Sequence, residues 1–216
     1  MSLSAPLVLV PETTIEPEPE KRRQILDGAT RVFLATGYEG ASMSAIALEA
    51  SVSKGTLYVY FTNKEALFSA VVKEACHRTT ERALDCLDGE GSLEAALVEF
   101  ARRYVDLMMS DESQTLYRLI VAESPKFPAI GQRFYETGPR RTLDRIKEFL
   151  HLRIKAGELV IDDVEIAAGQ FIELCKARIY MRKFIKVDKL TSGADMERVA
   201  AGAVKVFLGA YQAPRS

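Results

Sequence analysis

The sequence predicts an all-α protein, with a small three-helix domain followed by a larger helical bundle and about nine helices in total. Apolar residues recur three and four positions apart over most of the chain after residue 20, and no stretch of useful length shows the alternation of a β-strand. Gly and Pro fall between these periodic segments, where they end helices. With 216 residues, of which 48% are hydrophobic, the chain is long enough to bury a substantial core.

The N-terminal segment differs from the rest in composition. Residues 1–19 are rich in Pro and Glu after a short apolar run, Leu3 to Val10, and predict a disordered acidic tail. The apolar run is too short to cross a bilayer and follows no basic residues, so it predicts neither a signal peptide nor a membrane anchor. Residues 1–20 carry four acids and no Lys or Arg, whereas residues 21–80 carry eight Lys and Arg against five acids. This basic excess favours a nucleic-acid partner only weakly.

The first three helices are short and closely spaced. Helical periodicity begins at residue 20, and a glycine cap ends the first helix at Gly37. Ser42 can cap a second helix, and after a tight turn a third helix begins near Ser53. Two helices joined by so short a turn form a helix-turn-helix, whose second helix enters the major groove of DNA. The sequence therefore predicts a DNA-binding motif at residues 42–61, within a domain of residues 20–67.

Six further helices are expected in and beyond this domain, most of them in a bundle of residues 68–212. The first starts at Thr62 or Asn63, directly after the motif, and is long enough to belong to both domains. Asp162 offers an N-terminal cap for a later helix. The expected helices span residues 63–87, 92–108, 113–123, 128–155 with a break at Gly138-Pro139, 163–186 and 194–211.

The Cys and His residues predict neither a disulfide framework nor a metal ion or other cofactor. Cys76, Cys86 and Cys175 are odd in number and form no C-x-x-C pair, which favours a reducing cytoplasm. We interpret them as thiols buried on helices, and a redox role for Cys76 or Cys86 is the alternative. His77 and His151 have no second ligand at metal-binding spacing.

A larger set of spaced residues accompanies the motif: Ile25-Leu26-Asp27, Phe33, Gly37-Tyr38, Ser42-Met43, Ile46-Ala47, Val52-Ser53-Lys54-Gly55-Thr56-Leu57-Tyr58, Tyr60-Phe61, Lys64-Glu65 and Leu67-Phe68. With these residues the chain resembles the DNA-binding domain of the TetR family of bacterial transcriptional regulators. A looser match from Phe127 to Phe171 resembles one C-terminal subtype of that family. Two positions depart from the family pattern: Ser51 stands where Gly is usual, and Ala45 where many members carry an acid. If Ser51 needs a left-handed backbone, the strain is on the order of 1–2 kcal/mol.

The resemblance and the side-chain chemistry together imply which residues contact DNA. Positions equivalent to Tyr58, Tyr60 and Lys64 touch the DNA backbone in the family, and Lys54 can neutralise a phosphate. Thr56, with Ser53 and Lys54, is our choice for reading base edges. The alternative is that the two Tyr residues belong to the core of a small helical bundle. We expect Tyr58→Phe and Lys64→Ala to weaken DNA binding with little change in melting temperature. The complete expected set is Ser42, Ser53, Lys54, Thr56, Tyr58, Tyr60 and Lys64.

For the helical bundle, the resemblance implies a small-molecule pocket and a dimer interface. Candidate pocket residues, each of which can also be ordinary core, are Phe100, Tyr104, Met108, Tyr117, Phe134, Phe171, Cys175 and Arg178. Arg118 and Arg178 could meet an acidic ligand, although solvated or salt-bridged arginines are commoner. Small residues along one stripe of the last helix would let a partner helix approach closely, and the expected interface residues are Val199, Gly202, Ala203, Val206 and Gly209.

The sequence therefore predicts a sequence-specific, DNA-binding transcriptional regulator of the cytoplasm. The resemblance implies a homodimeric repressor that binds an inverted repeat in double-stranded DNA and is released by an unidentified small-molecule effector. Its two recognition helices would lie about one DNA turn apart, roughly 34–36 Å. A ligand-independent architectural or partner-controlled DNA-binding protein is the alternative. An enzyme built on a helical bundle is a remote one, because the sequence shows no convergent nucleophile, base or metal cluster and we expect no catalytic residues.

Overall fold

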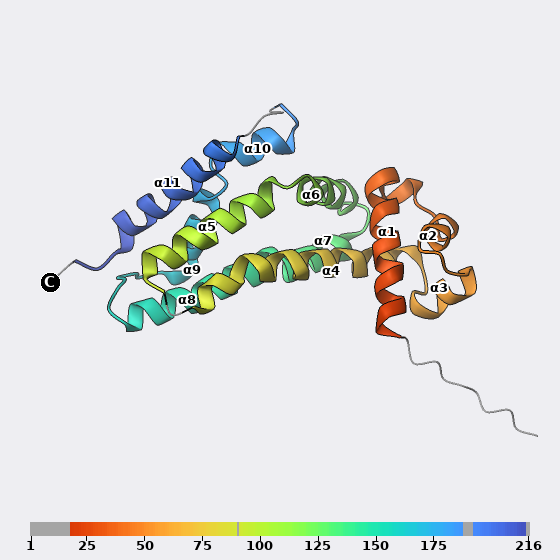
Figure 1. The fold of residues 1–216 in the computed structure, drawn as a ribbon, viewed down its shortest axis with the longest axis horizontal. Helices are drawn as coiled ribbons and strands as arrows, with labels where there is room; N and C mark the ends of the chain where they lie inside the picture. The colour runs from red at the N-terminus through yellow and green to blue at the C-terminus, as the bar shows by residue number, and fades with distance from the viewer. Residues whose placement is uncertain (1–17, 90, 188–191, 215–216) are drawn as a thin grey trace, which may run out of the picture.

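The computed structural model describes residues 18–89, 91–187 and 192–214, and these residues form an all-α fold (Figure 1). Eleven α-helices and one short 3-10 helix are present in the described ranges. The expected N-terminal tail lies outside the described residues, except for its last two positions. The molecule is elongated, with α1, α2 and α3 at one end and the remaining helices forming a bundle.

The helix-turn-helix end consists of α1 (Pro19–Gly40), α2 (Met43–Glu49) and α3 (Lys54–Tyr60). Regular geometry in α1 is interrupted at Gly37, which has a φ of 76°. Glycine adopts this left-handed conformation without the clash that a Cβ atom would cause, which is why the predicted cap falls there. From α3 the chain passes directly into α4 (Lys64–Leu84), which runs from this end into the bundle (Figure 1).

The bundle contains more helices than the sequence predicted, because two expected helices are each divided in two. Gly138 separates α7 from α8 at the expected break, with φ −114° and ψ −86°. Arg178, with a φ of 69°, starts α10 after a break that no Gly or Pro had indicated. The helices after α4 are η1 (Asp85–Asp88), α5 (Leu93–Met109), α6 (Asp111–Glu123), α7 (Pro128–Thr137), α8 (Pro139–Lys155), α9 (Val164–Leu174), α10 (Ile179–Phe184) and α11 (Gly193–Tyr211).

Side-chain caps fix the beginnings of several helices. Asn63, rather than Thr62, caps α4, and its Oδ1 accepts a hydrogen bond from the Ala66 amide at 2.8 Å. Asp163, rather than the predicted Asp162, caps α9 in the same way. In both cases the capping residue lies three positions before the amide that it bonds, so a shift of one residue would remove the contact.

Two buried apolar clusters form the core. The first combines α1, α2 and α3 with the beginning of α4, and continues through Cys76 to Leu116 and Ile120 of α6 and Ile130 of α7. The second lies among η1, α5, α8, α9, α10 and α11 and the end of α4. The predicted boundary at residue 67 therefore falls within α4 and within the first cluster. A division of the chain into independent domains at that point stays a prediction.

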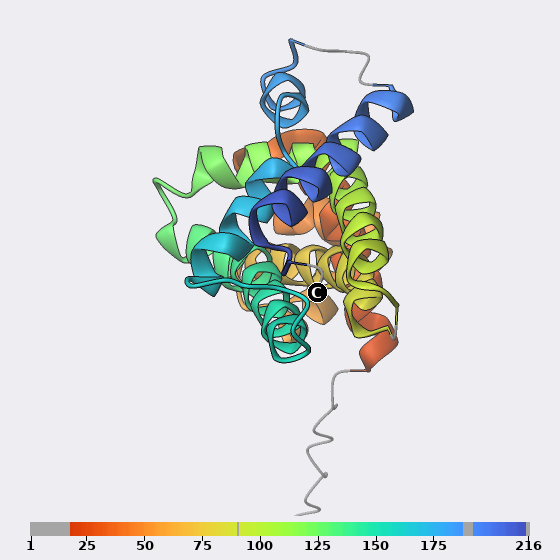
Figure 2. The same cartoon turned by 90° about the vertical axis from the view of Figure 1, so that its left-hand side faces the viewer.

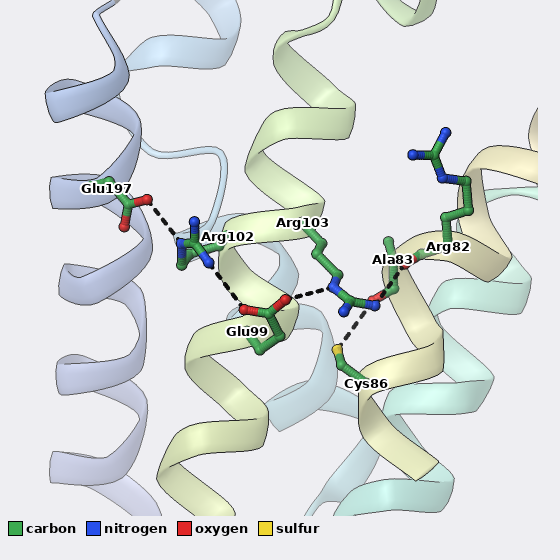
Figure 3. Close-up of polar contacts among 7 residues, drawn as sticks. All are labelled: Arg82, Ala83, Cys86, Glu99, Arg102, Arg103 and Glu197. Carbon is green, nitrogen blue, oxygen red and sulfur yellow. Dashed lines mark hydrogen bonds and ion pairs between the residues drawn. The ribbon is translucent and has the colours of Figure 1, made fainter. Parts of the chain in front are cut away.

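The α5 and α11 helices lie side by side on one flank of the bundle (Figures 1 and 2). Polar contacts connect this flank to α4 (Figure 3). Glu197 of α11 pairs with Arg102 of α5 at 2.8 Å, and Arg102 also pairs with Glu99. Glu99 pairs with Arg103 at 2.7 Å, and Arg103 donates a hydrogen bond to the Arg82 carbonyl of α4. Exposed ion pairs contribute little free energy one by one, so this network orients α4, α5 and α11 more than it stabilises them.

Candidate DNA-binding surface and ligand cavity

Local hydrogen bonds shape the helix-turn-helix. The Ser42 hydroxyl accepts a bond from the Ala45 amide at 3.1 Å, and the Ser53 hydroxyl accepts one from the Thr56 amide at 2.9 Å. Both serines thus cap a helix, and the sequence had predicted the cap at Ser42 and the start of a helix near Ser53. Between the helices Ser51 has a φ of 53°, so the left-handed backbone considered for this position is present. The Val52 amide bonds the Ala47 carbonyl at 2.9 Å across it, which closes the end of α2.

The outward face of α3 carries the expected polar groups. Lys54 is exposed, and half of the Tyr58 side-chain surface is accessible. Thr56 is half-buried, and its hydroxyl pairs with that of Ser53 at 2.8 Å. Tyr60 is half-buried against the first apolar cluster. The structure thus places Lys54 and Tyr58 where DNA can reach them, and it gives Tyr60 a packing role that the sequence had offered as the alternative.

Lys64 contacts the protein's own backbone. Its Nζ donates hydrogen bonds to the Tyr38 carbonyl at 2.8 Å and the Ala41 carbonyl at 3.0 Å, and lies 4.5 Å from the centre of the Tyr38 ring. The ammonium therefore holds the end of α1 against the start of α4. A phosphate contact by Lys64, which the resemblance implies, stays a prediction beside this structural role.

Two exposed apolar residues of the motif were missed by the sequence reasoning. Val59 on α3 is 61% exposed and Leu48 on α2 is 82% exposed. A signal for Val59 existed: it lies midway between the buried Leu57 and Phe61, so helical geometry turns it outward. An exposed aliphatic side chain beside a recognition helix's hydroxyls suits contact with a thymine methyl group.

A cavity of about 380 Å³ opens between α4 and the helices of the bundle, a size in the range of small-molecule sites. It lies between the helix-turn-helix end and the second apolar cluster. Its walls are mostly apolar, and they include Cys76, Thr79, Thr80, Tyr104, Met108, Gln114, Leu116, Tyr117, Phe134, Thr142, Ile172, Lys176 and Tyr180.

Half of the expected pocket residues line this cavity, namely Tyr104, Met108, Tyr117 and Phe134. The structure does not bring the others to its wall. Phe100 and Phe171 are fully buried, with ring centres 5.8 Å apart in the second cluster, and Cys175 is buried beside them. Arg178 is exposed, has a left-handed backbone conformation and pairs with Asp195 of α11.

Burial changes the acidity of groups on the cavity wall. The pKa of the Cys76 thiol is raised to about 11, mainly by burial, with a hydrogen bond to Thr137 acting in the opposite direction. Burial also raises the pKa of the Tyr104 phenol. Both groups therefore stay neutral at physiological pH.

The stripe of small residues on α11 is accessible along most of its length. Gly202, Val206 and Gly209 are exposed, and Val206 exposes 56% of its surface. Val199 is half-buried, whereas Ala203 faces the second cluster and is fully packed against the protein's own core. Four of the five expected residues thus remain available to a partner helix, and Ile166 of α9 adds an exposed apolar side chain that the prediction lacked.

The part of the chain that the structure describes has no group of three or more Cys, His, Asp or Glu residues able to hold a metal ion. Within those same ranges, no helix has the combined length and apolar character needed to cross a bilayer.

A helix-turn-helix with a polar, accessible second helix defines this protein as a DNA-binding transcriptional regulator. Residues 25–71 match the family model of bacterial regulatory proteins of the tetR family, and residues 95–213 match that of the C-terminal domain of AefR-like transcriptional repressors. The chain belongs to the TetR family.

Individual similar proteins are also regulators. A solved TetR-family regulator from Mesorhizobium loti is 30% identical, with a TM-score of 0.84 over 89% of this chain and 97% of that one. The flavonoid-responsive regulator FrrA is 34% identical, with a TM-score of 0.77 over 91% of this chain and 99% of its own. The transcriptional regulator SrpR of Pseudomonas putida is 26% identical over 94% of this chain and 88% of its length.

Proposed function

We propose that the protein is a homodimeric repressor of the bacterial cytoplasm, which binds an inverted DNA repeat and is released when a small molecule enters the cavity. The observation that carries the proposal is the position of Leu116. This α6 residue lines the cavity and also belongs to the apolar cluster that holds α1, α2 and α3 together. A ligand that displaces α6 would therefore disturb the packing that orients α3.

Several features support the other parts of the proposal. The accessible stripe on α11 suits a two-fold contact between identical helices, which would present two copies of α3 to successive major grooves. The free thiols suit a reducing compartment. The name of the relative FrrA records a response to flavonoids, which makes control by a small molecule a natural expectation for this chain.

On DNA, we propose that Lys54 and Tyr58 contact phosphates and that Thr56 and Val59 read base edges. Phosphate contacts supply affinity at any sequence, whereas contacts with base edges determine the sequence. Substitution of Lys54 should therefore weaken binding to all DNA, and substitution of Val59 should change which sequences are preferred.

The test is to select genomic fragments on the purified protein at two salt concentrations and to sequence them. A shared inverted repeat whose recovery survives the higher salt, and is lost in the Tyr58→Phe variant, would support the proposal. Fragments without a common sequence that disappear at higher salt would instead indicate an architectural DNA-binding protein. Release of a recovered fragment by candidate effectors would then test ligand control.

A further inference from the structure

Among the residues that the structure describes, the cavity wall carries one cationic side chain, and that cation already has an acidic partner. Lys176 pairs with Glu173, and its Nζ lies 5.8 Å from the centre of the Tyr180 ring. Arg118, which the sequence offered for an acidic ligand, is bonded instead to the Phe184 carbonyl and the Thr115 hydroxyl. A carboxylate or phosphate inside this cavity would therefore lack a free positive charge, and burying an unpaired charge is strongly unfavourable.

Gln114 presents an unpaired hydrogen-bond acceptor. Its Nε2 donates to the Met108 carbonyl at 2.7 Å, and because that carbonyl can only accept, the amide orientation is fixed. Its Oε1 is buried and has no hydrogen-bond partner. The residue is 1% exposed and lines the cavity. A buried acceptor without a partner in the protein is destabilising, and Oε1 has almost no accessible surface, so a ligand donor that meets it when the side chain turns toward the cavity recovers free energy.

Two hydroxyls of the same wall also lack partners within the described ranges. They belong to Thr80 of α4 and Tyr104 of α5, which are 5% and 7% exposed. Gln114 belongs to α6, so the unpaired groups come from three different helices. Each hydroxyl can donate or accept, whereas Gln114 Oε1 can only accept. The site is therefore most selective at Gln114, where the ligand must supply the proton.

Aromatic rings form another part of the wall. The Tyr117 ring lies 5.5 Å from Phe134 and 6.1 Å from Tyr180, measured between ring centres. Flat ligands stack or make edge contacts with such rings at these spacings.

We propose that the cavity binds a neutral aromatic molecule with a hydroxyl group that donates a hydrogen bond to Gln114 Oε1. This inference rests on the proposed function, because it names the chemical class of the effector. A phenol satisfies all the observations together: its ring fits the aromatic wall, its lack of charge fits the paired Lys176, and its O–H meets the unpaired acceptor. A methyl ether of the same ring would lack the proton, and the matching carboxylic acid would bring an unpaired charge.

The experiment compares 2-naphthol with 2-methoxynaphthalene and 2-naphthoate on the full chain, by titration followed through naphthalene emission. The chain contains no Trp, so this emission can be excited apart from protein fluorescence. We expect 2-naphthol to bind about 2- to 12-fold more tightly than its ether, the range that one net hydrogen bond supplies. We expect the carboxylate to bind more weakly than both. Equal binding of naphthol and ether, or tightest binding of the carboxylate, would overturn the inference.

Gln114→Met keeps the length of the side chain and removes the acceptor. In this variant the preference for naphthol over the ether should fall below about 2-fold. Gln132→Met is the matched control, because Gln132 is an exposed residue of α7 outside the cavity wall, and it should keep the wild-type preference. A naphthol preference that persists in Gln114→Met would place the hydrogen bond elsewhere and refute the assignment. The wild-type comparison remains decisive if the variant does not fold.

Binding and DNA release are measured separately, so the two proposals fail in different ways. Naphthol binding that depends on Gln114 but leaves a bound genomic fragment in place would contradict ligand-controlled release and uphold the ligand chemistry. Release of DNA by the ether or the carboxylate at lower concentrations than by naphthol would uphold ligand control and overturn the ligand chemistry.

Discussion

Replacement of Lys64 by Met should destabilise the protein, although the sequence alone led us to expect little change at this position. The ammonium bonds the Tyr38 carbonyl at the end of α1 and the Ala41 carbonyl just after it, lies 3.5 Å from the Glu39 carbonyl oxygen, and lies against the Tyr38 ring. Met retains an apolar stem of similar length, so the substitution removes mainly the charge and these contacts.

The magnitude follows from these contacts. Hydrogen bonds that involve a charged group contribute roughly 1.5–3 kcal/mol each, and a cation–π contact at a partly exposed site contributes about 0.5–1 kcal/mol. Lys64 is half-buried, so water can replace part of what the carbonyls lose. The sum runs from about 3.5 to 7 kcal/mol, and because water replaces part of it we expect the free energy of unfolding to fall by about 2 kcal/mol, below the lower end of the sum.

Urea denaturation followed by circular dichroism measures the change. With a slope of roughly 2 kcal/mol per molar urea, the midpoint should fall by about 1 M at the same protein concentration. Lys54→Met is the matched control, because Lys54 is exposed and has no ion pair in the described part of the chain. Its free energy of unfolding should change by less than about 0.5 kcal/mol. Equal midpoints for the two variants would refute the structural role of Lys64.

Four further predictions concern the backbone, the thiols and the proposed dimer. Ser51→Gly should raise the free energy of unfolding by about 0.5 kcal/mol, because relief of left-handed strain exceeds the added freedom of the unfolded chain, and a lower thermal midpoint would contradict this. Iodoacetamide at pH 8 should modify half-buried Cys86 before Cys76, by mass spectrometry, since burial raises the Cys76 pKa to about 11. The same pKa shift makes the free energy of unfolding depend on pH. The contribution of Cys76 is fully present below pH 9.0, the ordinary thiol pKa, and is lost progressively as the pH rises to about 11, because in that range only the unfolded thiol ionises. Gly202→Leu should give a folded monomer by light scattering, because a Cβ there meets nothing within 4 Å in the protomer, whereas Gly91→Leu in a loop should leave the dimer intact.

Features that depend on neighbouring residues were predictable from the sequence. The predicted cap at Ser42 follows from a side chain that reaches an amide three residues on, and the structure has it, together with caps of the same kind at the predicted helix starts Ser53 and Ser92. The break before α10 was not predictable in this way. No Gly or Pro marks it, and Arg178, at that break, pairs with Asp195, a residue that lies on a later helix.

The residues that line the cavity were also not predictable from sequence periodicity. Phe100 and Tyr104 lie four residues apart on one face of α5, with stacked rings 5.4 Å apart, so periodicity treats them alike. Only the arrangement of α4 and α6 decides that Tyr104 lines the cavity and Phe100 does not. Gln114 was missed because nothing near it in sequence marks a polar residue as buried. Its unpaired oxygen becomes evident only once the Met108 carbonyl is seen to take the amide nitrogen.

Two helices connect the cavity to the DNA-binding end in this structure, and the proposed release of DNA would act through them. The long helix α4 contributes Cys76 and Thr80 to the cavity wall, and α6 contributes Leu116, which also packs in the core of the DNA-binding end. A ligand that joins unpaired groups on α4, α5 and α6 favours the separation of these helices at which all its hydrogen bonds form. DNA favours the separation at which α3 fits the major groove. The ligand releases DNA only if these two separations differ. The free energy by which it weakens DNA binding cannot exceed the difference in its own binding free energy between the two arrangements. By the same linkage, DNA must weaken ligand binding by an equal factor.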